Sequence, residues 1–396
     1  MSILAIALIV LGALIVTISV VLVIGAFAPR IPYVGAYGSL IWPTLIGPAT
    51  IFVTIGTLLE LVAFQIGGSE VALAFAAVGG LALLGTLIIL GNQLIAAKRA
   101  GAPIRPKALV AAGLGPKSPP DDTATYTAGP DGEPLRIIVY RPRRTANGTS
   151  TVGAGAPIVV YVHGGGWFQG APDENPAILR WFADQGYVVF APAYTLATEA
   201  LATWDIAMTQ VAQALVWVGQ HAPEYGGDPQ RIAVWGASAG ANLTLVATYA
   251  ATSGKLPASI ADGFPHIAAV AGEVPAVDPK WIEHNTDPIW GPKTREMVVR
   301  YIGGTAEQHP ERLAAIQVET YLSPQAPPTL LTVSKGDHLV PVEGIRQFVD
   351  KASAAGVDIR AVYRPWGDHI ISAIYDGLTG QTMMRLLLAH FEAHGV

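Results

Sequence analysis

A serine between two glycines, in Gly236-Ala-Ser-Ala-Gly240, is the pattern in this sequence that most directly predicts chemistry. The apolar run Arg231–Trp235 before it is typical of a short buried strand, and the run from Ala241 onward is typical of a helix start. A G-x-S-x-G pattern between a strand and a helix is a nucleophile elbow: the glycines permit a tight turn, and the hydroxyl lies beside the helix N-terminus. The pattern therefore predicts a nucleophilic serine at Ser238.

A serine hydroxyl becomes an effective nucleophile only when a base removes its proton and a carboxylate orients that base. Downstream of Ser238, the predicted strand Thr329–Val333 leads into a turn that holds Asp337. The predicted strand Asp358–Tyr363 leads into a loop that holds His369. The order serine, acid, histidine, with each residue after a strand, is the order expected for a serine carried on such an elbow. We therefore expect His369 to be the general base and Asp337 to orient its imidazole.

Each of these two residues has a rival beside it in the chain, because His338 follows Asp337 and Asp368 precedes His369. Side chains of adjacent residues on a turn point apart, so neither rival is expected to complete the pair. We interpret Asp368 as an aspartate that caps its own loop.

A second glycine-rich segment, His163-Gly-Gly-Gly-Trp167, follows the apolar run Ala156–Val162, which predicts a strand. Acyl transfer develops negative charge on the carbonyl oxygen, and N–H donors must already face that oxygen. A glycine run lets the backbone approach the substrate, whereas neither common phosphate-binding glycine pattern is present. We expect the histidine to brace this loop and the donors to be the N–H groups of Gly165, Gly166 and Ala239, and of Gly164 as well.

Together, HGGGW at 163–167, GASAG at 236–240, Gly336-Asp337 and Asp368-His369 resemble the hormone-sensitive-lipase family of α/β-hydrolase esterases. The resemblance covers the chain from about residue 122 onward. It implies an α/β-hydrolase fold and hydrolysis of carboxylic esters with small to medium acyl groups, with no cofactor and no metal. It also implies that the family's triad and oxyanion donors map onto the residues named above. The sequence departs from the family's usual elbow at Ala237 and at Ala241-Asn242, where the family has Asp and Gly.

The composition excludes several other classes of protein. The 396-residue chain has a formal net charge of −5 and one short basic cluster, so nucleic acid is not an expected partner. The absence of cysteine excludes disulfides, thiolate metal sites and a cysteine nucleophile. Hydrophobic residues make up 51% of the chain and its mean hydropathy is +0.42, which indicates that part of it lies in lipid. The abundance of Ala and Gly is typical of a bacterial protein.

Three apolar stretches are long enough to cross a bilayer: Ser2–Ala28, about Leu40–Phe64 and about Val71–Ala97. No Lys or Arg precedes Arg30, so the first stretch is interpreted as a retained helix and not a signal peptide. A row of small residues in the third stretch predicts close helix packing: Ala72, Ala76 and Gly80. We interpret Glu60, near the end of the second stretch, as an interfacial residue.

Basic residues set the expected orientation: Lys98, Arg99, Arg105 and Lys107 follow the third stretch. Positive residues close to a span stay in the cytoplasm, which places the N-terminus outside and everything after the third span inside. The Pro- and Gly-rich composition of 98–122 predicts a linker at the membrane surface. We therefore expect a membrane domain at 1–97, a linker at 98–122 and a catalytic domain at 123–396.

In the catalytic domain, apolar strands alternate with helices, which indicates an α/β fold with a mostly parallel sheet covered on both faces. The long segment Gly272–Pro328 carries Trp281, Trp290 and Tyr301. It is interpreted either as a lid or wall over an acyl pocket, or as a packed surface excursion of the fold.

The sequence thus predicts a serine carboxylesterase or lipase anchored in the cell membrane by several spans, with membrane lipids around it and a small-molecule or lipid ester as substrate. Two alternatives remain open. An amide hydrolase, such as an arylacetamide-type deacetylase or a formamidase, would use the same machinery and differ in how the leaving group is protonated. A catalytically inactive hydrolase fold would serve as a membrane scaffold.

Overall fold

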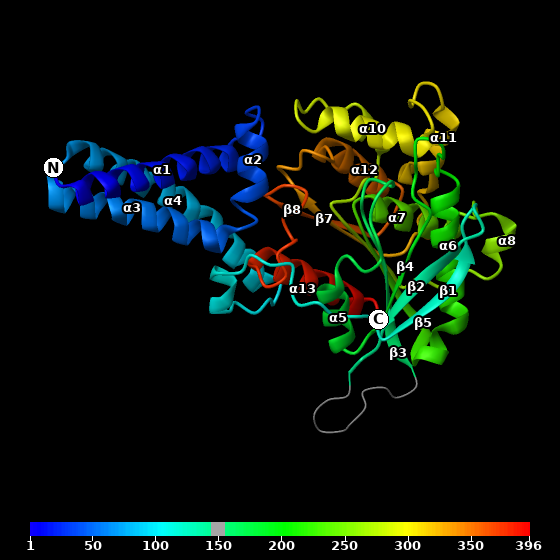
Figure 1. The fold of residues 1–396 in the computed structure, drawn as a ribbon. Helices are drawn as coiled ribbons and strands as arrows, with labels where there is room; N and C mark the ends of the chain where they lie inside the picture. Colours follow the sequence, from blue (N-terminus) through cyan, green and yellow to red (C-terminus); the bar gives the residue numbers. More distant parts are fainter. Residues whose placement is uncertain (144–154) are drawn as a thin grey trace. The chain divides into compact units, whose positions relative to one another are not determined.

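The computed structural model describes residues 1–143 and 155–396, and these residues form two compact units, each with its own interior (Figure 1). The first unit contains 1–115 together with two short segments from late in the chain, 334–338 and 364–386. The second unit contains the other described residues between 116 and 396.

Four α-helices dominate the first unit: α1 (Ile3–Phe27), α2 (Val34–Ile41), α3 (Ile46–Gly67) and α4 (Glu70–Arg99), followed by a short 3-10 helix, η1 (Pro106–Leu109). By length and composition, α1, α3 and α4 could each cross a membrane. These helices agree with the three predicted apolar stretches, except that the second was predicted to begin about six residues too early. Residues 34–41 form the separate helix α2, and the turn at 42–45 contains Pro43, which has no N–H to donate to a continuing helix.

One detail predicted for the spans is wrong. The small-residue row of α4 continues from Ala72 and Ala76 to Gly79, which lies near Thr57 of α3, whereas Gly80 is exposed. The helical period of 3.6 residues brings position 79 to that face. The side chain of Glu60 is fully buried, and a Cβ added at Gly12 of α1 would lie 2.8 Å from its Oε1 atom. Its position at the membrane interface stays a prediction.

Segments 334–338 and 364–386 belong to the first unit, and several contacts join the second of them to the rest of that unit. The rings of Phe27 and Trp366 meet edge to face at 5.5 Å, and Lys107 forms a 2.7 Å salt bridge with Asp376. The N–H of Tyr375 donates to the carbonyl of Gly113. The loops that follow the last two strands therefore belong structurally to the unit that carries the apolar helices.

The second unit is built on one eight-stranded sheet in the order β1-β2-β4-β3-β5-β6-β7-β8. Its strands are β1 (Asp122–Ala128), β2 (Pro134–Tyr140), β3 (Ala156–Val162), β4 (Val188–Pro192), β5 (Gly227–Ala237), β6 (Ala269–Glu273), β7 (Thr329–Ser334) and β8 (Ile359–Arg364). β1 and β2 pair antiparallel, as does β2 with β4, and the pairs from β4 through β3, β5 and β6 to β7 are parallel. The carboxyl ends of β3, β5, β6 and β7 therefore lie at one edge of the sheet.

Helices connect these strands: α5 (Pro176–Asp184), α6 (Ile206–His221), η2 (Ala222–Tyr225), α7 (Ala239–Thr252), α8 (Ala258–Ala261), α9 (Pro279–Glu283), α10 (Gly291–Ile302), α11 (Pro310–Ile316), η3 (Val318–Tyr321), α12 (Val342–Ala354) and α13 (Leu378–Ala393). Buried residues of α6 and α7 pack on one face of the sheet. On the other face, Phe182 of α5 packs against Trp235 of β5 and Phe391 of α13. The predicted α/β organisation, with helices on both faces of a mostly parallel sheet, is confirmed.

Candidate active site

Ser238 lies in the turn between β5 and α7, with φ 54° and ψ −117°. This conformation is strained for a residue with a side chain, and its neighbours hold it there. Its N–H donates to the carbonyl of Glu273 in β6 at 2.8 Å. A Cβ at Gly236 would lie 2.4 Å from the carbonyl oxygen of Gly240, and one at Gly240 would lie 2.2 Å from that of Val162, so both flanking positions require glycine. The serine therefore occupies a tight strand-to-helix turn at the start of α7.

The glycine loop that follows β3 passes directly beside this serine. A Cβ at Gly164 would lie 3.3 Å from the Cβ of Ser238. Gly165 and Gly166 have φ angles of 115° and 58°, a region of backbone conformation that favours glycine. A Cβ at Gly165 would lie 2.0 Å from the carbonyl oxygen of Gln169, which leaves no room for a side chain. The sequence-predicted donor loop and the predicted nucleophile are thus neighbours in the second unit.

His163 braces this loop from a buried position. Its Nδ1 donates to the carbonyl of Gly164 at 2.8 Å, and its ring stacks on Tyr194 with centroids 4.3 Å apart. The hydroxyl of Tyr194 donates to the carbonyl of His163. Burial lowers the pKa of His163 to about 4, so its imidazole is neutral near pH 7. A neutral, stacked imidazole suits a structural brace.

Helix α10, from the long segment 272–328, packs against the same loop. Trp167 has φ 65°, and its ring stacks on Tyr301 with centroids 4.7 Å apart and planes 4° apart. A Cβ at Gly166 would lie 2.8 Å from the sulfur of Met297. Tyr301 and Ile302 are fully buried within the main core. This part of the segment therefore adjoins the glycine loop and the core at once.

The loops after β7 and β8 bring the predicted acid and base together in the first unit. Oδ2 of Asp337 accepts from Nδ1 of His369 at 2.8 Å. The side chains are 1% and 12% exposed, so this bond is shielded from water. A carboxylate on Nδ1 fixes the tautomer of the ring and assigns proton transfer to Nε2.

The two rival residues, His338 and Asp368, pair with each other. Nδ1 of His338 lies 2.6 Å from Oδ2 of Asp368. Oδ1 of Asp368 accepts from the N–H of His369 at 2.7 Å, as expected of an aspartate that caps its own loop. In the dipeptides Asp337-His338 and Asp368-His369, the aspartate of each is thus paired with the histidine of the other.

Comparison with known proteins places this chain in a family. A family model described as BD-FAE matches residues 148–351, just over half of the chain. The chain belongs to the BD-FAE family. This match, together with the relatives below, supports the resemblance to esterases of the hormone-sensitive-lipase type.

Curated relatives of this BD-FAE chain include three from Mycobacterium tuberculosis. The probable carboxylic ester hydrolase LipM is 29% identical, over 50% of this chain and 44% of LipM. Esterase LipC is 27% identical, over 60% of this chain and 59% of LipC. Carboxylesterase NlhH is 38% identical, over 30% of this chain and 35% of NlhH. The matches thus cover between 35% and 59% of the length of these relatives.

Solved structures of a thermophilic esterase from the planctomycete Thermogutta terrifontis have a similar fold. The butyrate-bound form gives a TM-score of 0.55 at 23% identity, over 69% of this chain and 94% of that one. The apo form gives a TM-score of 0.55 at 22% identity, over 71% of this chain and 97% of that one. These matches confirm the predicted α/β-hydrolase fold of the BD-FAE chain.

Sequence reasoning overlooked Glu273, the last residue of β6. Its carbonyl accepts from the N–H of Ser238, and its side chain is 9% exposed. In the sequence analysis this residue falls within the long segment Gly272–Pro328 and not in a strand, so it was not considered as a partner for a base. A carboxylate directly after an apolar strand was the available signal.

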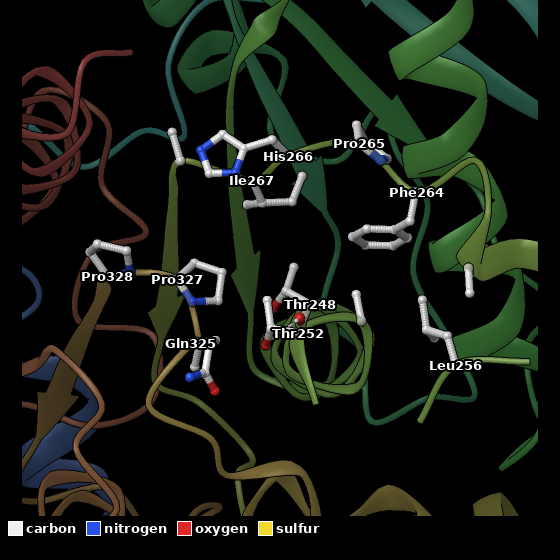
Figure 2. Close-up of a pocket in the computed structure, with 14 residues that line it drawn as sticks. Thr248, Thr252, Leu256, Phe264, Pro265, His266, Ile267, Gln325, Pro327 and Pro328 are labelled. Carbon is white, nitrogen blue, oxygen red and sulfur yellow. Dashed lines mark hydrogen bonds between the residues drawn. The ribbon is translucent and has the colours of Figure 1, made fainter. Parts of the chain in front are cut away.

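A cavity of about 450 Å³ lies at the far end of α7 from Ser238 (Figure 2). Thr248 and Thr252 of α7, Phe264, His266 and Gln325 help to line it. Ser238 precedes α7, whose 14 residues extend about 20 Å. This cavity therefore contains none of the predicted site residues.

Within 1–143 and 155–396, the structure groups no three His, Asp or Glu side chains that could hold a metal ion.

Proposed function

We propose that this protein is a membrane-anchored serine carboxylesterase in which Ser238 is the nucleophile, His369 the general base and Asp337 the residue that orients the imidazole. The observation that carries the proposal is the strained backbone of Ser238 beside the glycine loop. The two are so close that a Cβ added at Gly164 would lie 3.3 Å from the Cβ of Ser238. A serine on such a tight turn can present its Oγ to a carbonyl carbon, and the adjacent N–H groups then stabilise the oxygen anion.

The sheet topology supports the assignment of the base. Ser238 directly follows β5, Asp337 follows β7 by three residues, and His369 follows β8 by five. The N–H of Thr329 donates to the carbonyl of Asp358, and the N–H of Lys335 donates to that of Arg364, which shows that β8 is parallel to β7. Ser238, Asp337 and His369 therefore all follow strands at the carboxyl edge of the sheet. Nδ1 of His369 is bonded to Asp337, which leaves Nε2 to receive the serine proton.

The reaction then follows in two halves. Ser238 Oγ attacks the ester carbonyl while its proton passes to Nε2 of His369, and N–H groups of Gly165, Gly166 and Ala239, with Gly164 beside them, bind the anionic oxygen. His369 protonates the departing alkoxide, and an acyl-enzyme remains. A water molecule that gives its proton to the same nitrogen hydrolyses this ester and restores the serine.

Ester hydrolysis is distinguished from the alternatives by a matched substrate panel. We expect the purified full-length protein to hydrolyse p-nitrophenyl esters of graded acyl length at least about 100-fold faster than the corresponding p-nitroanilides, since an amide nitrogen is the harder group to expel. Comparable rates on both series would favour the amide hydrolase. A folded protein that hydrolyses neither series and does not react with a fluorophosphonate probe would favour the inactive scaffold.

For the membrane side, we propose that α1, α3 and α4 cross the cell membrane and that the hydrolase domain faces the cytoplasm. Lys98 and Arg99 end α4, and basic residues at the end of a span resist translocation. Protease added to intact spheroplasts should remove a tag placed before α1 and leave the hydrolase domain whole. Digestion of that domain before lysis, with the tag protected, would contradict this orientation.

A further inference from the structure

The carboxylate of Asp368 receives four donors in a site with no solvent exposure. Its Oδ1 accepts from the N–H of His338 at 3.0 Å and from the N–H of His369 at 2.7 Å. Its Oδ2 accepts from Nδ1 of His338 at 2.6 Å and from Oγ of Ser39 at 3.1 Å, which shares its single hydrogen with the carbonyl of Gly35 at 2.8 Å. One buried side chain therefore joins the loop after β7, the loop after β8 and helix α2.

The second ring nitrogen of His338 reaches the segment between the first two predicted spans. Its Nε2 lies 2.7 Å from the carbonyl oxygen of Pro29. A carbonyl only accepts, so Nε2 carries a hydrogen, and Nδ1 carries one because the Asp368 carboxylate accepts there. With both nitrogens protonated, His338 is an imidazolium held between a carboxylate and a carbonyl. Its side chain is 9% exposed, and such shielded charge-assisted bonds are strong and directional.

The segment that this pair contacts is itself firmly packed. A Cβ at Gly25 of α1 would lie 1.9 Å from the carbonyl oxygen of Val34, so α1 and α2 meet backbone to backbone. Gly336, two residues before His338, also lies against this segment, since its added Cβ would be 3.5 Å from the Cβ of Ser39. The Phe27–Trp366 ring contact adds a third attachment.

We infer that His338 and Asp368 form a positioning pair through which the segment Pro29–Ser39, between the first two apolar helices, sets the position of the Asp337–His369 pair. The inference rests on the proposed function of those two residues. Asp337 precedes His338 and His369 follows Asp368, so a shift of either partner moves the acid or the base directly. The membrane region thereby becomes part of the catalytic apparatus as well as an anchor.

Substitutions in the pair test this role through kcat and KM measured separately on the full-length protein. His338→Gln removes the imidazolium. Asp368→Asn replaces the carboxylate that accepts from Nδ1 of His338 with a neutral amide. We expect each to lower kcat roughly 10- to 100-fold, the scale of a displacement of about 1 Å, with KM within about 3-fold. The double variant should be no slower than the worse single variant, because both changes break the same link.

Ser39→Ala provides a milder test that leaves the hydrolase domain unaltered. It removes the hydroxyl that donates to Asp368 and should lower kcat about 3- to 10-fold with KM unchanged. The matched control is Ser19→Ala in α1, because Ser19 is also fully buried and its Oγ bonds only within its own helix, to the carbonyl of Ile15. That control should retain the wild-type kcat.

The outcomes separate this inference from the function on which it rests. Wild-type kcat in His338→Gln and in Ser39→Ala, with an active wild-type enzyme, would overturn the positioning role alone. Equal losses in Ser39→Ala and Ser19→Ala would also overturn it, since they would reflect general damage to the helices. If His338→Gln fails to fold, the comparison of kcat between Ser39→Ala and Ser19→Ala tests the positioning role. No ester turnover by the wild type would overturn the proposed function and this inference together.

Discussion

Ser238→Ala is expected to lower kcat for ester hydrolysis by about 10⁴-fold or more while the protein remains folded. The serine oxygen forms the covalent bond to the acyl group, and alanine has no oxygen to replace it. Alanine fits the site because the only atom removed is Oγ. The residual rate should reflect the oxyanion donors and substrate binding alone.

The measurement is steady-state turnover of a p-nitrophenyl ester, combined with fluorophosphonate labelling followed by peptide mapping. The label should be on Ser238 in the wild type and absent from the variant. Ser253→Ala is a matched control on the same helix, because the Ser253 hydroxyl bonds to the carbonyl of Ala250 at the opposite end of α7. It should keep both turnover and labelling. Undiminished turnover in a folded Ser238→Ala protein would refute the assignment of the nucleophile.

Asp337→Asn is expected to lower kcat by about 10³- to 10⁴-fold with a small change in KM. The asparagine can turn its amide toward Nδ1 of His369, which stabilises the tautomer that carries hydrogen on Nε2. That tautomer cannot accept the serine proton. The neutral amide also gives no stabilisation to the imidazolium that forms during attack.

Glu273→Gln is the decisive comparison, because Glu273 is a carboxylate at the end of β6, and its carbonyl accepts from the N–H of Ser238. We expect it to change kcat by less than about 10-fold, since the imidazole of His369 is bonded to Asp337. The two variants should be measured with the same substrate, and their unfolding temperatures compared with the wild type. A larger loss in Glu273→Gln than in Asp337→Asn would show that Glu273 is the acid.

Features that depend on neighbours in the chain could be predicted from the residues alone. The order of strands and helices from residue 122 onward could be predicted because buried parallel strands are continuous apolar runs and their helices are amphipathic. The elbow at Ser238 and the glycine loop at 163–167 could be predicted because few residues other than glycine tolerate such backbone approaches. Three apolar helices could be predicted from the length and hydropathy of their stretches alone.

Features that depend on residues distant in the chain could be read only from the folded protein. Adjacent residues could be excluded as partners from the sequence, but the crosswise pairing of Asp337 with His369 and of His338 with Asp368 depends on how two loops pack. The attachment of Asp368 to Ser39 joins positions 329 residues apart, and no periodicity or motif records such a contact. Burial of Glu60 against Gly12 likewise depends on which faces of α1 and α3 meet. Local patterns report backbone preference and hydropathy, whereas the partner of a polar side chain is fixed only when the chain brings distant segments together.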